Sequence, residues 1–135
     1  MQNKKAFTLL EMIFAIVVIA VLASYAIPKF FNTTNDAKVS TLQRDITTVI
    51  TSVQSYYLLN LKIDKISDAV NLNSKTWEIN DTSITYKEND KECVKIELSS
   101  TSDKDKIIVT VDNSTGNICK KLNDNGVSTT SYDLN

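Results

Sequence analysis

The side chains that usually carry catalytic chemistry are scarce in this chain. It has 135 residues, no His and two Cys, Cys93 and Cys119, which are not in a CxxC spacing. Without His, neither a Ser/His/Asp nor a Cys/His catalytic set can be built, and a zinc site of the usual type lacks ligands. The glycines, Gly116 and Gly126, are isolated, which excludes a Gly-rich phosphate loop. The sequence therefore predicts no catalytic residue, no metal and no cofactor.

The charge balance argues against a function based on bulk electrostatics. There are 15 Lys and Arg against 16 Asp and Glu, which gives a net charge of −1 at pH 7. From Asp36 to the end the counts are 12 basic and 15 acidic, a difference of −3. Because no basic excess is present, we do not expect nucleic acid as a partner.

One carboxylate, Glu11, lies in an otherwise apolar N-terminal segment. Residues 7–27 number 21, and as a helix they would span about 31 Å, close to the hydrocarbon thickness of a bilayer. Lys4 and Lys5 precede the segment and favour a cytoplasmic N-terminus. A carboxylate in such a segment costs about 2 to 3 kcal/mol in a bilayer, so its presence needs a reason.

Three interpretations of this segment compete. A secretory signal peptide would be removed after small residues such as Ala23 or Ala26. A plain signal anchor would stay uncleaved. Neither has a use for Glu11.

The third interpretation rests on the sequence KKAFTLLEMIFAIVVIAVLASYAIPKFF, at about the first 31 residues. It resembles the N-terminus of the type IV prepilin family, which includes pilins and the pseudopilins of type II secretion and DNA-uptake machines. The resemblance implies that a membrane-embedded prepilin peptidase cuts between Ala6 and Phe7 and methylates the new amino terminus of Phe7. Ala6 is a departure, because the family usually has Gly there. The resemblance also implies that Glu11 meets the Phe7 amine of a neighbouring subunit and helps to set axial register during assembly.

Beyond this segment the helical pattern continues with an amphipathic character. Pro28 is expected to kink the helix. We expect one helix from Phe7 to about Asn60, although the weak joint at Asn32 to Asp36 could instead end a first helix. The apolar residues recur at spacings of three or four: Val39, Leu42, Ile46, Val49, Ile50, Val53 and Tyr57.

From Ser74 onward the pattern changes to period two, which predicts strands of an antiparallel sheet. A four-stranded meander is the simplest assembly, with Ile118 and Leu122 continuing the series and Cys119 on a strand. The segment from Leu61 to Asn73 is either a loop or contains a short helix at 67–72. The alternating apolar residues are Trp77, Ile79, Ile84, Tyr86, Val94, Ile96, Leu98, Ile107, Val109 and Val111.

The expected fold is therefore α+β, a long N-terminal helix packed on a small antiparallel sheet, as in pilins. Residues 1–6 form the leader, 7–27 the transmembrane and filament-core helix, and 28–60 its amphipathic second half. Residues 61–135 form the sheet part and make one domain with 36–60.

The two cysteines have the same parity relative to the apolar alternation and could meet across neighbouring strands. In an exported domain an even pair indicates a disulfide, here closing a loop of about 26 residues. The family often carries a disulfide near its C-terminus, which supports the pairing of Cys93 with Cys119. The alternative is two unrelated thiols.

Two weaker motifs remain. Residues 123–126, Asn-Asp-Asn-Gly, with Ser128 and Asp133, offer oxygen ligands where major pseudopilins have a calcium loop, but the match is poor and no ligand is assigned. Residues 78–82 contain an Asn-x-Thr acceptor at Asn80 with an acid, Glu78, two positions before it. Some bacteria glycosylate this form; the alternative is a chance match.

These observations favour a structural subunit of a type IV pilus-like filament, preferably a pseudopilin of a type II secretion or related export or uptake machine, because the globular part is small and poor in Gly and Ala. The alternatives are a pilin of a type IV pilus and a membrane-anchored binding module outside the cytoplasm. The implied partners are prepilin peptidase, other pilin-like subunits, an inner-membrane assembly platform and the lipid bilayer. The expected location is the bacterial inner membrane, with one membrane pass and the C-terminal domain in the periplasm or on an extracellular filament.

Overall fold

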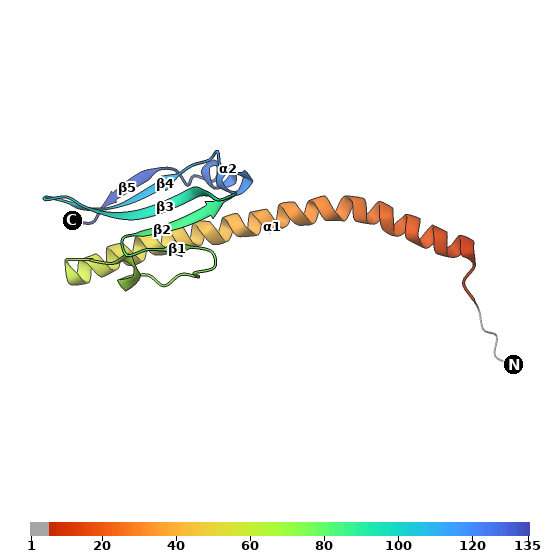
Figure 1. Ribbon diagram of the computed structural model, residues 1–135, viewed down its shortest axis with the longest axis horizontal. Helices are drawn as coiled ribbons and strands as arrows, with labels where there is room; N and C mark the ends of the chain where they lie inside the picture. The colour runs from red at the N-terminus through yellow and green to blue at the C-terminus, as the bar shows by residue number, and fades with distance from the viewer. Residues whose placement is uncertain (1–5) are drawn as a thin grey trace. The chain divides into compact units, whose positions relative to one another are not determined.

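The chain divides into two compact units (Figure 1). The computed structural model describes residues 6–135. The first unit ends at Asn35 and contains the first part of helix α1 (Leu9–Asn60). The second unit, Asp36–Asn135, contains the remainder of α1 and all the strands.

Helix α1 continues through the weak joint at residues 32–36, so the prediction of one long helix is confirmed and the alternative of two helices is wrong. The helix begins at Leu9 and not at Phe7 as expected. Thr33 and Thr34 donate their hydroxyls to the carbonyls of the residues four positions earlier, at 2.9 and 3.0 Å. Each hydroxyl thus has a hydrogen-bond partner within the helix. The Thr side chains therefore do not draw the backbone into a competing non-helical conformation. Pro28 lies inside α1. A kink there stays a prediction.

The second unit is built on a five-stranded antiparallel sheet with the order β1-β2-β3-β4-β5. The first four strands form the predicted meander, and their alternation places the apolar residues in cross-strand rows, for example Ile84 opposite Ile96 and Ile96 opposite Val109. The strands are β1 (Glu78–Ile79), β2 (Ser83–Glu88), β3 (Lys91–Ser100), β4 (Asp105–Val111) and β5 (Thr130–Asp133).

Two elements near the C-terminus differ from the prediction. The segment with Ile118 and Leu122 forms helix α2 (Asn117–Asp124), so the expectation of a strand at Cys119 was wrong. The buried residues are Ile118, Cys119 and Leu122; Ile118 and Cys119 lie four and three positions before Leu122, the spacings of one helix face. Strand β5 was not predicted, because all four of its residues are exposed and no apolar alternation marks it.

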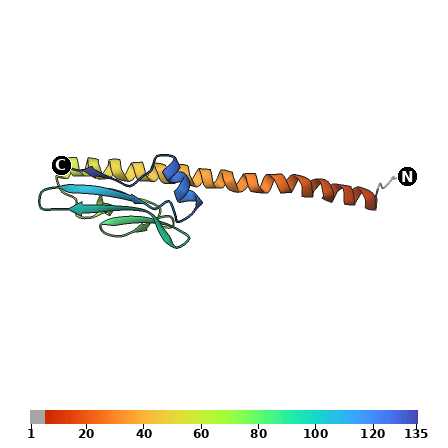
Figure 2. The same ribbon diagram turned by 90° about the horizontal axis from the view of Figure 1, so that it is seen from above.

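The core of the second unit lies between α1 and the sheet. Residues 36–60 of α1 run along one face of the sheet in both views (Figures 1 and 2). The predicted apolar stripe of α1 is buried from Val39 to Tyr57, except that Ile50 is only partly buried. Trp77 is 1% exposed and its indole Nε1 donates to Asp45 at 2.8 Å, which satisfies the one polar group of this large side chain.

The connection from α1 to the sheet is mostly irregular. The connection contains the short 3-10 helix η1 (Ile66–Asp68), which begins one residue earlier and ends sooner than the short helix considered at 67–72. Ile66 is fully buried and anchors the connection in the core. Every residue of the core cluster lies between Val39 and Leu134, so the second unit has a complete core of its own.

Candidate functional site: the start of α1 and the disulfide region

The N-terminus of α1 is closed by a side chain that the sequence analysis missed. Thr8 precedes the first helical residue, and its Oγ1 accepts a hydrogen bond from the backbone N–H of Glu11 at 3.2 Å. The Thr8 carbonyl accepts the N–H of Met12 at 3.1 Å, which is the first helical bond. The spacing Thr-x-x-Glu is the sequence form of a capping box, so a signal was present. Thr8 thus sets where the helix begins and places Glu11 in its first turn.

The expected cleavage site lies directly before this cap. Ala6 and Phe7 are exposed and outside the helix, and the Phe7 side chain is 75% exposed. A peptidase could therefore reach the bond between them without unwinding α1. Glu11 is exposed too, in the turn where the positive end of the helix dipole favours a carboxylate. The predicted leader charges on Lys4 and Lys5 lie outside the described residues, and the roles of Ala6, Phe7 and Glu11 stay predictions.

The first unit presents large apolar side chains to its surroundings. Between Phe7 and Phe31 their exposed fractions run from 39% at Val18 to 79% at Leu9. Among the described residues, α1 is the one helix that is long and apolar enough to cross a membrane, by length and composition. A signal sequence near the N-terminus would satisfy the same criterion. The apolar helix is consistent with a single membrane anchor.

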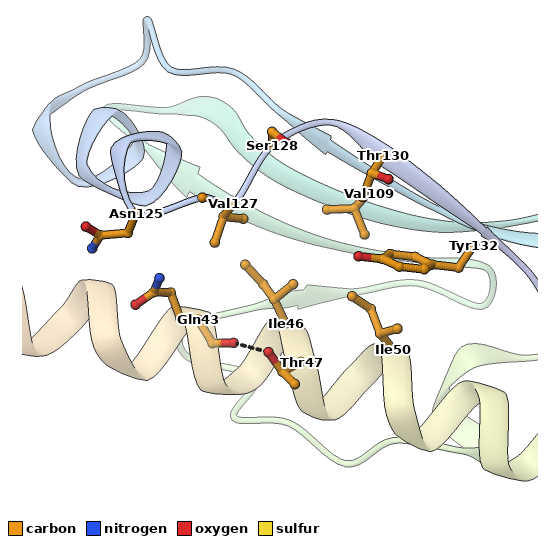
Figure 3. A pocket seen from close by; sticks show the side chains of 11 residues that line it. Gln43, Ile46, Thr47, Ile50, Val109, Asn125, Val127, Ser128, Thr130 and Tyr132 are labelled. Carbon is orange, nitrogen blue, oxygen red and sulfur yellow. Dashed lines mark hydrogen bonds between the residues drawn. The ribbon is translucent and has the colours of Figure 1, made fainter.

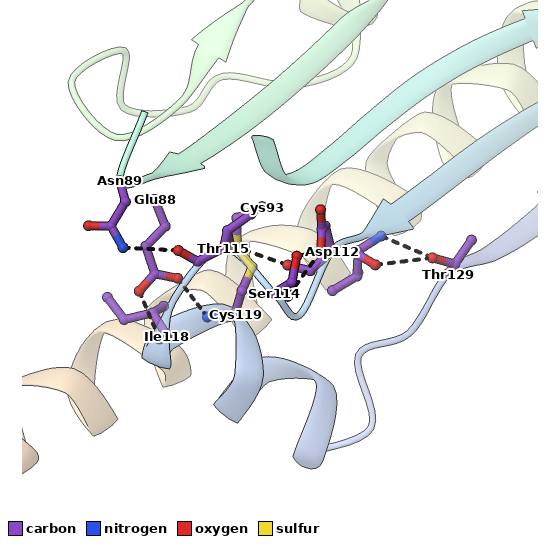
Figure 4. The surroundings of a disulfide bond; sticks show 10 residues. Glu88, Asn89, Cys93, Asp112, Ser114, Thr115, Ile118, Cys119 and Thr129 are labelled. Carbon is purple, nitrogen blue, oxygen red and sulfur yellow. Dashed lines mark hydrogen bonds between the residues drawn. A yellow bond between two sulfur atoms is a disulfide. The ribbon is translucent and has the colours of Figure 1, made fainter. Parts of the chain in front are cut away.

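Cys93 of β3 and Cys119 of α2 form a disulfide (Figure 4). Their Cα atoms are 5.8 Å apart, within the usual range, and both side chains are buried. The expected pairing is present, although it joins a strand to a helix and not two strands. A carboxylate oxygen of Glu88 and the sulfurs of Cys93 and Cys119 lie within 4.8 Å of one another, which is close enough for three ligands of one metal ion. Sulfurs bonded to each other do not offer thiolate ligands, so this cluster supports no metal proposal.

Glu88, the last residue of β2, caps helix α2 from a distant part of the chain. Its Oε1 accepts the N–H of Ile118 and its Oε2 accepts the N–H of Cys119, both at 2.9 Å (Figure 4). These are charge-assisted bonds to helix-terminal N–H groups that otherwise lack partners. At Gly116 an added Cβ would clash with the Glu88 carboxyl group, so the absence of a side chain allows this approach. No local pattern near α2 indicates this cap, because Glu88 precedes it by about 30 residues.

The turns on either side of the disulfide are held by side-chain amide and carboxylate groups. Asn89 and Asp90 join β2 to β3 with φ of 52° and 61°, the left-handed pair that a two-residue hairpin favours. The Asn89 amide donates to the Thr115 carbonyl at 2.9 Å. Hydrogen bonds from the hydroxyl and the backbone N–H of Ser114 hold the pKa of the Asp112 carboxyl below 3.8. The disulfide, Glu88 and Asn89 together fix the start of α2 against β3.

A groove of about 330 Å³ opens in the second unit between α1 and the C-terminal segment (Figure 3). Ile46 and Ile50 of α1 face Val109 and Tyr132 across it. Of the residues that could offer oxygen ligands to calcium, Asp133 is paired with Lys104 and Lys106, each at 3.7 Å. The others end α2 or line the groove: Asn123, Asp124, Asn125 and Ser128.

Comparison with known proteins bears on the N-terminal segment. Residues 1–27 match a family model described as the prokaryotic N-terminal methylation motif. This motif is the type IV pilin-like prepilin signature, so the chain carries that signature. No curated protein and no solved structure matches the chain significantly.

The signature and the fold agree on the class of protein. A long N-terminal helix with an antiparallel sheet is the pilin-like α+β arrangement that the sequence predicts. The motif supports a type IV pilin-like protein that is processed as a prepilin, and indicates a structural subunit and not an enzyme. It implies processing by prepilin peptidase and assembly with other pilin-like subunits.

Proposed function

We propose that the chain, after removal of residues 1–6, is a structural subunit of a type IV pilus-like filament. Within that class we propose a pseudopilin of a type II secretion or related export or uptake machine, because the globular unit is small and poor in Gly and Ala. Its place is the inner membrane with the second unit outside the cytoplasm, and its partners include an assembly platform and the bilayer. The observation that carries the proposal is the methylation motif at the start of an exposed apolar helix.

The exposed apolar surface of the first unit requires two different environments in turn. Before assembly, lipid covers side chains such as Leu9, Phe14 and Phe30, each exposed by 70% or more. In a filament outside the membrane no lipid is available. Exposing apolar surface to water costs about 25 cal/mol per Å², so in the filament this surface is covered by protein. Copies of the same helix have the matching length and chemistry.

Glu11 gives this association a register. Cleavage before Phe7 creates an amino group near the start of α1, and in an apolar surrounding neither that amine nor the carboxylate is stable alone. Pairing between the Glu11 carboxylate and a Phe7 amine neutralises both charges. Because the pair forms at one relative height of two helices, it selects that height among otherwise similar apolar contacts.

A further surface of the second unit suits contact with neighbouring subunits. Residues 46–61 contain no charged side chain, in a chain that is 23% charged. At the end of this stretch Leu58, Leu59 and Leu61 are 72%, 85% and 77% exposed. On the exposed side, Thr47, Thr48, Thr51 and Ser55 donate their hydroxyls to backbone carbonyls four residues earlier, so they lose little when water is removed.

The test is Glu11→Val in the full chain, with Met12→Val as the matched control one position away. We expect Glu11→Val to insert and to be cleaved and methylated at Phe7, because the segment becomes more apolar, while its incorporation into filaments falls at least about tenfold, the equivalent of about 1.4 kcal/mol. Met12→Val should assemble normally. The readouts are the mass of the mature N-terminus and the fraction of cleaved protein in sheared filaments, or secretion where filaments are short. Wild-type assembly of Glu11→Val would contradict the role of Glu11, and an unprocessed N-terminus in the wild type would contradict the proposal itself.

A further inference from the structure

We propose that Asn80, in the turn between β1 and β2, is the acceptor of an N-linked glycan. The five residues Glu78-Ile79-Asn80-Asp81-Thr82 have the acid-x-Asn-x-Thr form of a bacterial acceptor. The proposal rests on the proposed function in one respect, because the glycan is added outside the cytoplasm and the second unit must be exported to receive it.

The turn presents its side chains to solvent. Asn80, Asp81 and Thr82 are all exposed, and they follow the last residue pair of β1 and β2, Ile79 opposite Ile84. The backbone N–H of Asn80 donates to the Ser83 carbonyl at 2.8 Å and closes the turn. Among the described residues the Asn80 side-chain amide makes no hydrogen bond. The nitrogen that would carry the sugar is therefore accessible in the folded unit.

The turn is held through its backbone and through an ion pair of Asp81 with Lys65 at 3.5 Å, which leaves the side chains of Asn80 and Thr82 without hydrogen bonds among the described residues. The Asp81 carbonyl accepts the N–H of Ile66 at 2.7 Å, and the Thr82 carbonyl accepts the N–H of Leu98 at 2.8 Å. Strand β1 is an edge strand that pairs with β2 over two residues (Figure 1). Because so few bonds hold it, local opening of the edge to fit an enzyme's acceptor groove costs little compared with unfolding.

The acidic residue of the motif is also at the surface. Glu78 pairs with Lys87 at 2.7 Å, and their side chains are 55% and 46% exposed. An exposed ion pair of this kind contributes about 0 to 1 kcal/mol, so the carboxylate can exchange Lys87 for a basic group of an enzyme without a large loss of stability.

The chain contains two other Asn-x-Ser/Thr sequences, and the structure disfavours both. They begin at Asn32 and Asn113, and neither has an acid two positions earlier. In the sequence at Asn113 the hydroxyl residue, Thr115, is 5% exposed and donates to the Asp112 carbonyl at 3.2 Å. The sequence at Asn32 lies inside α1. Asn113, itself exposed, is thus a matched control for Asn80.

The transfer reaction is balanced with one co-reactant, an oligosaccharide linked to a lipid pyrophosphate. The Asn80 amide nitrogen attacks the anomeric carbon, a C–N bond forms, and the C–O bond to the pyrophosphate breaks. The amide loses one proton to a basic group of the transferase or to water, and the lipid pyrophosphate leaves with the electron pair of the broken bond. No oxidant or reductant is required.

The experiment is mass spectrometry of the protein purified from the cells that produce it, comparing wild type, Asn80→Gln, Thr82→Ala and Asn113→Gln. We expect the peptide with Asn80 to carry an added saccharide mass in the wild type and in Asn113→Gln, and the mass to disappear completely in Asn80→Gln and Thr82→Ala. A bare Asn80 in the wild type, or a saccharide that survives Asn80→Gln, would overturn the proposal.

The same digest separates this proposal from the proposed function. The N-terminal peptide reports whether the chain begins at methylated Phe7. Methylated Phe7 together with a bare Asn80 would reject the glycan and leave the filament subunit intact. A saccharide on Asn80 with an unprocessed N-terminus would support export and the glycan and reject the prepilin processing.

Discussion

Removing the disulfide of the second unit should lower its stability by an amount that loop length determines. The bridge closes a loop with a sequence separation of 26 between Cys93 and Cys119. In the chain-entropy model such a loop contributes about 3.5 kcal/mol at 25 °C, since the unfolded chain loses about 12 cal/mol/K. With a urea m-value of about 1.5 kcal/mol/M, the midpoint of unfolding falls by about 2 M.

The assay is urea unfolding of residues 36–135, followed by Trp77 fluorescence, because this unit contains its complete core and its one Trp. The variant is Cys93→Ala with Cys119→Ala, which removes both sulfurs and leaves no free thiol. Wild type treated with reductant is the matched control, since it opens the same loop without changing side-chain volume. Reductant should have no effect on the double variant.

Reduction of the wild type and the double Cys→Ala variant open the same loop, and the comparison separates the loss of loop-closure entropy from the loss of side-chain packing. Both sulfurs are buried, with Cys93 1% and Cys119 0% exposed, so replacement by Ala adds a packing loss to the loop effect. We expect the reduced wild type to lose about 3.5 kcal/mol and the double variant somewhat more. If full reduction, verified by alkylation of both thiols, shifts the midpoint by less than about 0.5 M, the loop argument is refuted.

Three further predictions concern the cap of α2, the turn that precedes α2 and the cap of α1. Gly116→Ala should destabilise the second unit by about 1 to 2 kcal/mol in urea unfolding, because the new Cβ displaces the Glu88 cap; a loss that stays unchanged in a Glu88→Ala background would contradict this. Asp112→Asn should destabilise the unit at neutral pH, and the difference should shrink as pH falls through the folded pKa of Asp112, because a lowered carboxyl pKa contributes stability that is present above the unfolded pKa and lost below the folded one; a pH-independent difference would refute it. Thr8→Ala should increase hydrogen exchange at the start of α1 by about fivefold in micelles, the equivalent of about 1 kcal/mol; unchanged exchange would exclude the cap.

The parts of the fold with regular periodicity could be predicted from the sequence. The stripe from Val39 to Tyr57 has the helical spacing, and β1 to β4 have the alternation of half-buried strands. At residues 32–36 the sequence left two alternatives, one helix or two, because Asn and Thr are weak helix formers. There Thr33 and Thr34 satisfy their own hydroxyls within the helix, and the helix continues.

The elements that were missed depend on contacts distant in the sequence or carry no pattern. Strand β5 has four exposed residues and is defined by its pairing with β4, which no local spacing reveals. The start of α2 depends on Glu88, which looks like an ordinary turn residue in the sequence because nothing nearby shows where its carboxylate binds. Thr8 is a different case, since its capping box was readable but could also be attributed to the prepilin resemblance.

The two units follow opposite rules of burial, and this difference decides what the sequence can predict about each of them. In the second unit the residues of the core pack against partners in the same chain, so their position and register depend on the whole sheet. In the first unit apolar residues occur around the entire helix and are exposed. In the proposed function, lipid or other subunits cover them. For a helix surface that lipid or other copies of the helix cover, apolar composition and length are enough to determine which environment it fits. In the proposed function one charge, that of Glu11, then sets the register between copies. Glu11 therefore stands out in the sequence for the same physical reason that motivates its proposed role in assembly.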